Sequence, residues 1–337
     1  MKRRKFFPAG KLPAGVLSGL LAEPVTGDPE VLVRGGVGED AAVLRFGGRL
    51  LAAKADPVTF AGDRPGWYAV QVNANDIAAS GGRCRWFLAS LLLPEHGTDE
   101  TLVREIFDDI RAACAGLGVE LVGGHTEITG GLERPVVAGF MLGEAERLYR
   151  KQDLRPGDRL LLTKSLAVEG TALLAREFGD RLQGRVSADE LKKAAGFLDE
   201  PGISVVAEAR AAVATGRVVA MHDPTEGGLA TALAELAEAA GAGVEVELER
   251  VPVCEETRRF CDLFGLDPLG LIASGSLLIA CRPEDTEAVR KAVTAEGIAC
   301  TEIGRMLPAG EGLVEIVRGR RQPLRRFERD EICRMYE

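Results

Sequence analysis

The stretch "GGVGEDAAVLRFGGRLLAAKADPV" (residues 35–58) contains the spacing G-x-G-x-x-A, beginning at Gly36, that occurs in dinucleotide-binding loops. Such a loop has to follow a strand and open a helix. Here two short apolar runs surround the pair Gly47-Gly48 instead. Two apolar runs joined by two glycines are typical of a β-hairpin, so the stretch predicts a hairpin and the dinucleotide interpretation is rejected.

Two carboxylates flank the predicted hairpin. Asp40 lies just before its first strand and Asp56 just after its second. Because antiparallel strands bring these two ends together, we expect both carboxylates at one end of a sheet. Aspartate is also an ordinary turn residue, and for these two positions alone that alternative stays open.

The next segment, "GWYAVQVNANDIAASGG", predicts a helix over residues 67–80 that ends at paired glycines. Asn73 and Asp76 lie one turn apart on the same face of this helix, and Asn75 lies to one side. Polar residues this dense in an apolar helix are costly unless they are paired or bind a cation.

A second polar group follows a strand further along the chain. The segment "VELVGGHTEI" predicts a strand that runs into Gly123 and Gly124, followed by His125, Thr126 and Glu127. Polar side chains therefore recur at the ends or faces of several elements. Magnesium takes oxygen ligands and often bridges phosphates, so the pattern favours a metal–triphosphate site.

Composition narrows the classes of function. The chain has 337 residues, a net charge of −9 and no apolar stretch long enough to cross a membrane. An acidic chain argues against nucleic acid as the main partner. Seven scattered cysteines without a C-x-x-C motif are typical of thiols in a reducing cytosol, and three histidines argue against a zinc site. We expect a cytoplasmic protein with no membrane and no nucleic-acid partner.

Five motifs occur in a fixed order: "GEDAAVL", "KADPVTF", "VNANDIAASGG", "LVGGHTEI" and "MHDPTEGGLATAL". Together they resemble the aminoimidazole ribonucleotide (AIR) synthetase superfamily, which includes selenophosphate synthetase, thiamine-monophosphate kinase and the hydrogenase maturation protein HypE. The resemblance covers nearly the whole chain and extends in particular to HypE and related proteins.

The resemblance implies a mixed α/β (α+β) fold with two domains. Residues 1–150 would form an ATP- and Mg²⁺-binding domain that gives four strands to a half-barrel completed by a second subunit. Residues 151–337 would form a C-terminal α/β domain. A charged connector that ends at Pro156-Gly157 supports this boundary independently. The expected assembly is a homodimer.

The resemblance also implies that the γ-phosphate of ATP is transferred to an oxygen of the substrate, with Mg²⁺ neutralising charge. The implied metal ligands, which would also hold the nucleotide, are Asp40, Asp56 and Asp76. Further implied ATP contacts are Lys11, Asn75, Gly123, Gly124 and Thr126. The implied catalytic residues are His125 and Asp223.

The run "MHDPTEGGLA" places His222 and Asp223 before a predicted helix that starts near Thr225. Thr225 is a suitable N-cap, and a helix N-terminus with bare amides suits an anion. A capped helix start with close packing is the structural alternative.

The C-terminus departs from HypE, whose terminal cysteine carries a carbamoyl group. This chain ends "RDEICRMYE", with four residues after Cys333. The spacing of Leu324, Phe327, Ile332 and Met335 predicts one face of a short amphipathic helix. A helix docked by that face would make Cys333 a structural thiol.

We therefore expect an ATP- and Mg²⁺-dependent enzyme that activates an amide or carbamoyl oxygen of an unidentified small molecule. Two alternatives stay open. One is a small-molecule kinase resembling thiamine-monophosphate kinase, and the other is a nucleotide-binding accessory protein that binds a maturation partner without turnover. Replacing Asp76 by asparagine is expected to abolish ATP hydrolysis and leave the fold intact, on the assumption that Asp76 is a surface carboxylate.

Overall fold

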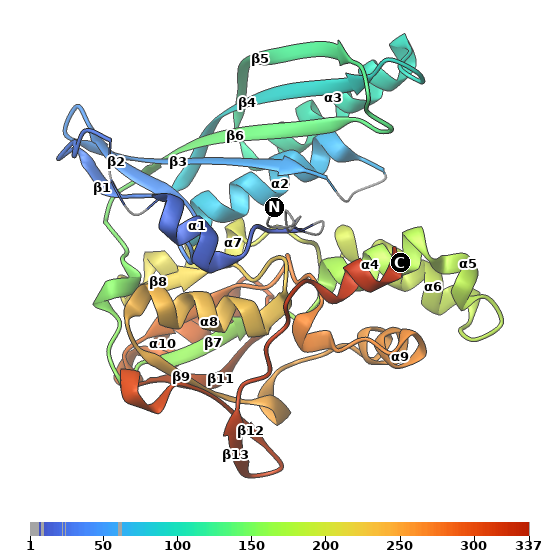
Figure 1. The fold of residues 1–337 in the computed structure, drawn as a ribbon. Helices are drawn as coiled ribbons and strands as arrows, with labels where there is room; N and C mark the ends of the chain where they lie inside the picture. Colours follow the sequence, from blue (N-terminus) through green and yellow to red (C-terminus); the bar gives the residue numbers. More distant parts are fainter. Residues whose placement is uncertain (1–6, 8–9, 22, 24, 60–62, 337) are drawn as a thin grey trace, which may run out of the picture.

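The computed structural model describes residues 7, 10–21, 23, 25–59 and 63–336. Two β-sheets, one in each half of the chain, are covered by helices, and the helix Pro65–Ala79 of the first half packs against the helix Val206–Ala214 of the second (Figure 1). The mixed α/β fold class predicted from the sequence is confirmed. Within the described residues, no helix is long and apolar enough to cross a membrane.

The N-terminal half holds a six-stranded sheet in the order β1-β2-β3-β6-β4-β5, where the resemblance implied four strands. Its strands are β1 (Val31–Val33), β2 (Ala42–Phe46), β3 (Arg49–Val58), β4 (Arg83–Pro94), β5 (Glu120–Thr129) and β6 (Val136–Ala145). The predicted hairpin is confirmed, because β2 pairs with β3 around Gly47-Gly48. The second strand is longer than predicted, so Asp56 lies inside it rather than after it.

Two helices cover one face of this sheet, α2 (Pro65–Ala79) and α3 (Glu100–Leu117), and a short helix α1 (Ala14–Leu21) lies near the seam between the halves (Figure 1). Pro65 begins α2, where its missing N–H is no loss. The Asp99 side chain caps α3 by accepting a hydrogen bond from the Leu102 amide at 2.8 Å. The predicted helix over residues 67–80 is confirmed.

Strand β5 corrects the prediction for the glycine pair. Gly123 and Gly124, with His125, Thr126 and Glu127, lie within the strand and not after it. Gly124 has φ +150°, and a Cβ atom there would stand 1.9 Å from the Ala89 carbonyl oxygen on the parallel neighbour β4. Gly124 therefore allows β4 and β5 to approach closely. The prediction was wrong because it took the glycine pair as the end of the strand.

A connector with a short 3₁₀ helix, η1 (Lys151–Asp153), leads into the C-terminal sheet, ordered β13-β12-β9-β11-β7-β10-β8. Its strands are β7 (Arg159–Thr163), β8 (Val218–His222), β9 (Gly243–Glu247), β10 (Leu278–Cys281), β11 (Cys300–Leu307), β12 (Leu313–Val317) and β13 (Arg320–Pro323). The helices of this half are α4 (Val168–Glu177), α5 (Gly179–Leu182), α6 (Ala188–Ala195), α7 (Val206–Ala214), α8 (Gly228–Ala240), α9 (Glu255–Phe264) and α10 (Thr286–Ala295).

Two further predictions about the second half need correction. Thr225 is not the N-cap of α8, since the helix begins at Gly228 and Gly227, at φ +82°, occupies the cap position. The C-terminal segment forms a 3₁₀ helix of five residues, η7 (Glu331–Met335), rather than an amphipathic α-helix. The predicted burial holds nevertheless: Ile332, Cys333 and Met335 all pack into the C-terminal core.

Candidate active site

A cleft of about 440 Å³ lies between the two halves. Both halves line it, together with the segment before α1 that includes Lys11. Carboxylates outnumber cationic side chains among its described lining residues. Its acidic members are Glu39, Asp40, Asp56, Asp76, Asp223, Glu226, Glu235, Glu328 and Asp330.

Asp40 is the centre of a buried ion-pair network that joins the halves. One carboxylate oxygen accepts a hydrogen bond from Lys151 Nζ at 2.7 Å, and the other bonds to His222 Nδ1. His222 Nε2 lies 3.2 Å from Glu235 Oε2. Burial alone would raise the pKa of Asp40, but the positive charges of His222 and Lys151 hold it well below its usual range. Burial opposes protonation of His222, and the Asp40 charge raises its pKa above the ordinary value.

A second ion-pair group connects strand β3 to helix α2. Lys54 Nζ lies 3.0 Å from Asp76 Oδ1 and 3.6 Å from Asp56 Oδ2. Burial of Asp76, which is 5% exposed, raises its pKa to about 7, and Lys54 only partly offsets this effect. The assumption that Asp76 is a surface carboxylate is therefore wrong.

Asp223 completes the cluster from the end of β8. One ligand atom from each of Asp40, His222 and Asp223 lies within 4.8 Å of the others. Burial, together with the charges of Asp76 and Asp40, raises the pKa of Asp223 well above its ordinary value. Carboxylates held this close repel one another unless protons or a cation intervene.

The outer part of the cleft carries Lys11 and the loop before α8. Lys11 Nζ donates a hydrogen bond to Thr225 Oγ1 at 3.1 Å. Burial raises the pKa of Glu226, and Lys11 opposes this shift. Asp330 holds the loop in place by accepting backbone hydrogen bonds from Gly227 at 2.6 Å and Ile272 at 3.2 Å.

These residues suit a magnesium–triphosphate complex better than a bare anion. A triphosphate alone would be repelled by the carboxylates, whereas Mg²⁺ takes oxygen ligands and bridges phosphates. The Asp56 side chain is 43% exposed in the cleft and is accessible to a ligand. The pKa values of Asp76 and Asp223 are raised, and a bound cation would relieve the repulsion between these carboxylates. Asp40 is less accessible as a ligand, because both of its oxygens already bond to cationic groups.

The structure brings together five of the sequence-predicted residues: Asp40, Asp56, Asp76, Asp223 and Lys11. It does not bring Asn75 to them. The Asn75 amide donates to the Ile203 carbonyl at 2.7 Å, and its oxygen accepts from the Val205 amide at 2.8 Å, so this side chain ties the two halves together.

Strand β5 also lies apart from the cleft within one chain. Its residues Gly123, Gly124, His125 and Thr126 are separated from β3 by strands β4 and β6. Three strand spacings amount to about 14 Å. His125 is exposed, and its Nε2 lies 3.0 Å from Glu127 Oε2.

Two members of the buried network were missed from the sequence, Lys151 and Glu235. Lys151 lies in the charged connector, where a lysine is expected to be solvated, and its partner Asp40 is 111 residues away. Glu235 is an ordinary polar position on α8 by spacing alone. The sequence motif that contacts both residues is the "HD" pair, because His222 lies next to Lys151 and Glu235 in the structure.

Glu169 on α4 is a buried carboxyl beside this seam. Its Oε2 has no hydrogen-bond partner among the described residues. Burial raises its pKa from 4.5 to about 7, a hydrogen bond from Ser274 opposes the shift, and the negative charges of Asp330 and Glu226 add to it. Ionising Glu169 therefore costs folding free energy.

We expect Glu169→Gln to become more stable, relative to the wild type, as pH rises. The folded-state pKa is raised, so the stability that protonated Glu169 contributes is present below about pH 4.5 and is lost as pH rises through about 7. The difference in free energy of unfolding should change by roughly 3 kcal/mol at most. Denaturant unfolding of both proteins at several pH values, without metal, measures it. If the free energies of unfolding of the two proteins differ by the same amount at every pH, the raised pKa of Glu169 is contradicted.

The chain resembles known proteins over most of its length. Residues 38–145 match the N-terminal domain of AIR synthase related proteins, and residues 155–316 match the C-terminal domain. Carbamoyl dehydratase HypE of Rhodobacter capsulatus is 30% identical over 269 residues, which cover 77% of this chain and 75% of that protein. HypE of Cupriavidus necator is 28% identical over 294 residues, covering 84% and 80%.

Solved structures of HypE proteins resemble this chain over most of its length. HypE in complex with ATP has a TM-score of 0.71 and 26% identity, covering 90% of this chain and 91% of that one. A HypE–HypF complex has a TM-score of 0.75 at 18% identity, covering 93% and 99%, and shares the fold. Fold and cleft together define a two-domain α/β protein with an acidic site between its halves. The chain belongs to the AIR synthase related protein family, as its motifs predicted.

Proposed function

We propose that this protein is an ATP- and Mg²⁺-dependent enzyme that activates an amide or carbamoyl oxygen of a small molecule by phosphoryl transfer. The observation that carries the proposal is the convergence of Asp56, Asp76 and Asp223 with Lys54 in one cleft between the halves. A relative of similar sequence is named carbamoyl dehydratase, and another was solved with ATP. Both support an oxygen-activating reaction.

Each group in the cleft has a distinct part in this proposal. Asp56, Asp76 and Asp223 would hold Mg²⁺, which would supply positive charge to offset that of the phosphates. Lys54 lies beside two of these carboxylates and is placed to neutralise a phosphate oxygen. Asp40 is held by Lys151 and His222 and would hold the two halves in position around the cleft. It could bind Mg²⁺ only if its hydrogen bond to Lys151 or His222 were broken.

The test is a screen for ADP release with amides, carbamoyl compounds and phosphorylated precursors, in the presence of Mg²⁺. Phosphorylation of the substrate oxygen forms a P–O bond and releases ADP, and later loss of that oxygen releases orthophosphate. Orthophosphate together with ADP would support the proposal. A stable phosphorylated product would instead identify a kinase. ATP binding without ADP release for any compound would favour an accessory role.

We infer further that the protein is a homodimer joined through its N-terminal sheet. No residue of the edge strand β5 is buried. Val122 and Ile128 on β5 are 51% and 58% exposed, and Phe140 on β6 is 40% exposed. An open edge with apolar side chains is expected to pair with another chain. Such pairing would give β5, including His125 and the glycine pair, a second subunit to contact.

Replacing Ile128 by lysine should weaken the dimer, because it places an unpaired charge in the apolar contact. We expect the dissociation constant to rise by at least about tenfold. Phe46→Lys is the matched control, since Phe46 is 76% exposed at the turn of the hairpin β2–β3. Sedimentation velocity at micromolar concentration measures both. A wild type that is a stable monomer would overturn the inference.

The C-terminal cysteine is proposed to be structural. Cys333 is 9% exposed and lies between the buried residues Ile332 and Met335. Cys333→Ala should therefore keep wild-type ATP turnover with the true substrate, and mass spectrometry should find no carbamoyl group on the thiol. Loss of turnover with ATP binding retained, or a carbamoyl or cyano adduct on Cys333, would restore a cysteine-based mechanism like that of HypE.

The division of labour follows from these proposals. Residues 1–150 would act as the domain for ATP, Mg²⁺ and dimerisation, and residues 151–337 would close the cleft with Asp223 and the loop before α8. A relative with the same fold forms a complex with the protein HypF. A maturation protein is therefore a candidate partner, and co-purification with tagged protein from its native host tests it.

A further inference from the structure

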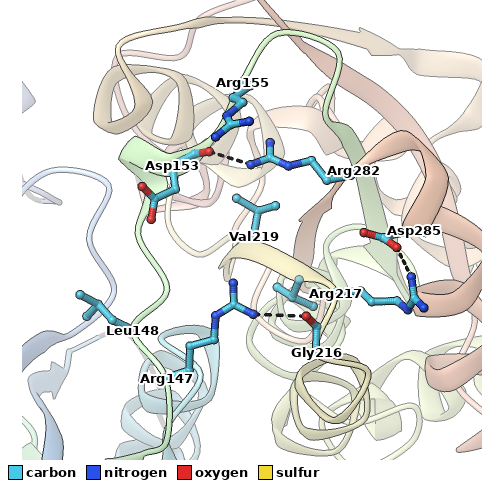
Figure 2. Close-up of a pocket in the computed structure, with 10 residues that line it drawn as sticks. Arg147, Leu148, Asp153, Arg155, Gly216, Arg217, Val219, Arg282 and Asp285 are labelled. Carbon is cyan, nitrogen blue, oxygen red and sulfur yellow. Dashed lines mark hydrogen bonds and ion pairs between the residues drawn. The ribbon is translucent and has the colours of Figure 1, made fainter.

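A second cavity, of about 300 Å³, lies outside the acidic cleft and shares none of the described residues that line that cleft. It is formed where the connector between the halves passes the start of strand β8 and the turn between β10 and α10 (Figure 2). Four arginines line it: Arg147, Arg155, Arg217 and Arg282. Such a concentration of positive charge contrasts with the net charge of −9 for the whole chain.

Two of these guanidinium groups are neutralised within the structure. Arg282 Nη1 lies 2.6 and 2.5 Å from the two carboxylate oxygens of Asp158. Arg217 forms an ion pair with Asp285. These pairs fix the two side chains in the wall of the cavity, and Arg282 also bonds to the Asp153 carbonyl at 3.3 Å (Figure 2).

The other two guanidinium groups have no carboxylate partner among the described residues. Arg147 donates one hydrogen bond, to the Gly216 carbonyl at 3.2 Å, and stacks over Tyr149. Arg155 makes no side-chain hydrogen bond or ion pair within the described part of the chain, and only its backbone amide bonds to Asp158. Both acidic residues of the lining already have cationic partners, Asp153 in Arg150 at 3.0 Å and Asp285 in Arg217.

Unneutralised guanidinium groups that share a cavity repel each other, and an anion bound between them removes that repulsion. Arginine suits phosphate in particular, because its planar fork donates two parallel hydrogen bonds to phosphate oxygens. Besides the four arginines and the carboxylates of Asp153 and Asp285, the lining consists of Gly216 and the apolar residues Leu148, Val218 and Val219. The volume lies at the lower end of the range for small-molecule sites, which is roughly 300–1,000 Å³.

We propose that this cavity binds a small phosphate-bearing molecule, with Arg147 and Arg155 contacting phosphate oxygens and Val219, which lies between them, contacting the body of the ligand. Figure 2 shows Arg147 directed toward Val219 from one side, with Arg155 and Arg282 grouped on the other. The ligand would rest on the connector that also carries Lys151, the lysine that holds Asp40 in the acidic cleft. The site is thus separate from the proposed ATP site and adjoins the same connector.

Titration calorimetry with pyrophosphate as the probe tests this proposal. The buffer contains EDTA and no divalent cation, because the acidic cleft repels a bare polyanion. The wild type should bind with saturation, and Arg147→Ala/Arg155→Ala should bind at least about tenfold more weakly. Arg155→Ala alone removes a side chain with no internal partner, so it keeps the test valid if the double variant fails to fold.

The matched control is Arg104→Ala/Arg111→Ala on α3, which removes the same charge from side chains that are 72% and 63% exposed. Its affinity should equal that of the wild type. Three results would overturn the proposal: no saturable binding by the wild type, unchanged binding by both cavity variants, or an equal loss in the control. The last result would show attraction to overall charge and not a site.

Discussion

Asp76→Asn should reduce magnesium-dependent ATP turnover by at least roughly 100-fold while the protein stays folded. The residue lies on α2, 5% exposed, with its carboxylate 3.0 Å from Lys54. Asparagine keeps the shape but removes the charge that would bind Mg²⁺. The loss should therefore fall on turnover, and it should not be rescued by saturating ATP alone.

We expect Asp76→Asn to change the free energy of unfolding little, because of the groups around Asp76. Burial raises the pKa of Asp76 to about 7, so its charged form is already disfavoured in the folded protein. Lys54 keeps a second acidic neighbour, Asp56, at 3.6 Å. The substitution consequently leaves no cation unpaired, and the thermal unfolding midpoint should stay close to that of the wild type.

Asp108→Asn is the matched control, because it makes the same chemical change at an exposed position on α3. Both variants are compared with the wild type in a coupled assay for ADP, with Mg²⁺ varied. A folded Asp76→Asn protein with unimpaired turnover would remove Asp76 from the site. Loss of turnover together with loss of the thermal transition would instead assign Asp76 a structural role.

The sequence was most informative where the signal is local. Gly47-Gly48 between two apolar runs predicts the hairpin, because a two-residue turn fixes the pairing of the strands beside it. The helix over residues 67–80 is predicted by the spacing of its apolar side chains, and the observed bounds differ by two residues or fewer. That Asp56 and Asp76 would meet in one site was implied by the family resemblance, because neither element fixes how the helix packs on the hairpin.

Local rules failed where tertiary contacts decide. Gly124 looks like the end of a strand, but it is required inside β5 by the close approach of Ala89. The spacing from Leu324 to Met335 correctly indicated burial, yet the chain there contacts the core without completing an α-helix. Apolar spacing reports which side chains are buried more reliably than it reports the type of helix.

The ion-pair network around Asp40 could not be predicted from the sequence, for a different reason. Lys151 and His222 are separated from Asp40 by 111 and 182 residues, and no periodic pattern links them. A lysine in a charged connector is normally solvated. Only the packing of one half against the other makes this lysine a buried partner of Asp40.

Lys151→Met should destabilise the protein by roughly 3 kcal/mol, the lower end of the range for breaking a buried ion pair. Lys151 and Asp40 side chains are each 4% exposed, and Lys151 Nζ also donates to the Gly38 carbonyl. Methionine fills similar space but leaves the Asp40 charge with one cationic partner, His222. That remaining pair is why we expect the lower end of the range.

Lys291→Met provides the control for this effect. Lys291 also forms an ion pair, with Glu287 at 3.4 Å, but the two side chains are 72% and 56% exposed. An exposed pair contributes about 1 kcal/mol or less, so this variant should unfold almost as the wild type does. Urea unfolding of both variants at neutral pH and without metal measures the difference.

The double variant Asp40→Asn/Lys151→Met separates the loss of a pair from the loss of packing. If the cost of Lys151→Met comes from an uncompensated charge at Asp40, removing that charge should restore a large part of the lost stability, because the two sites are directly coupled. If the methionine simply packs badly, the second substitution should restore nothing. Equal stability of Lys151→Met and Lys291→Met would contradict a stabilising buried pair, and with it the view that Lys151 anchors Asp40 in the cleft.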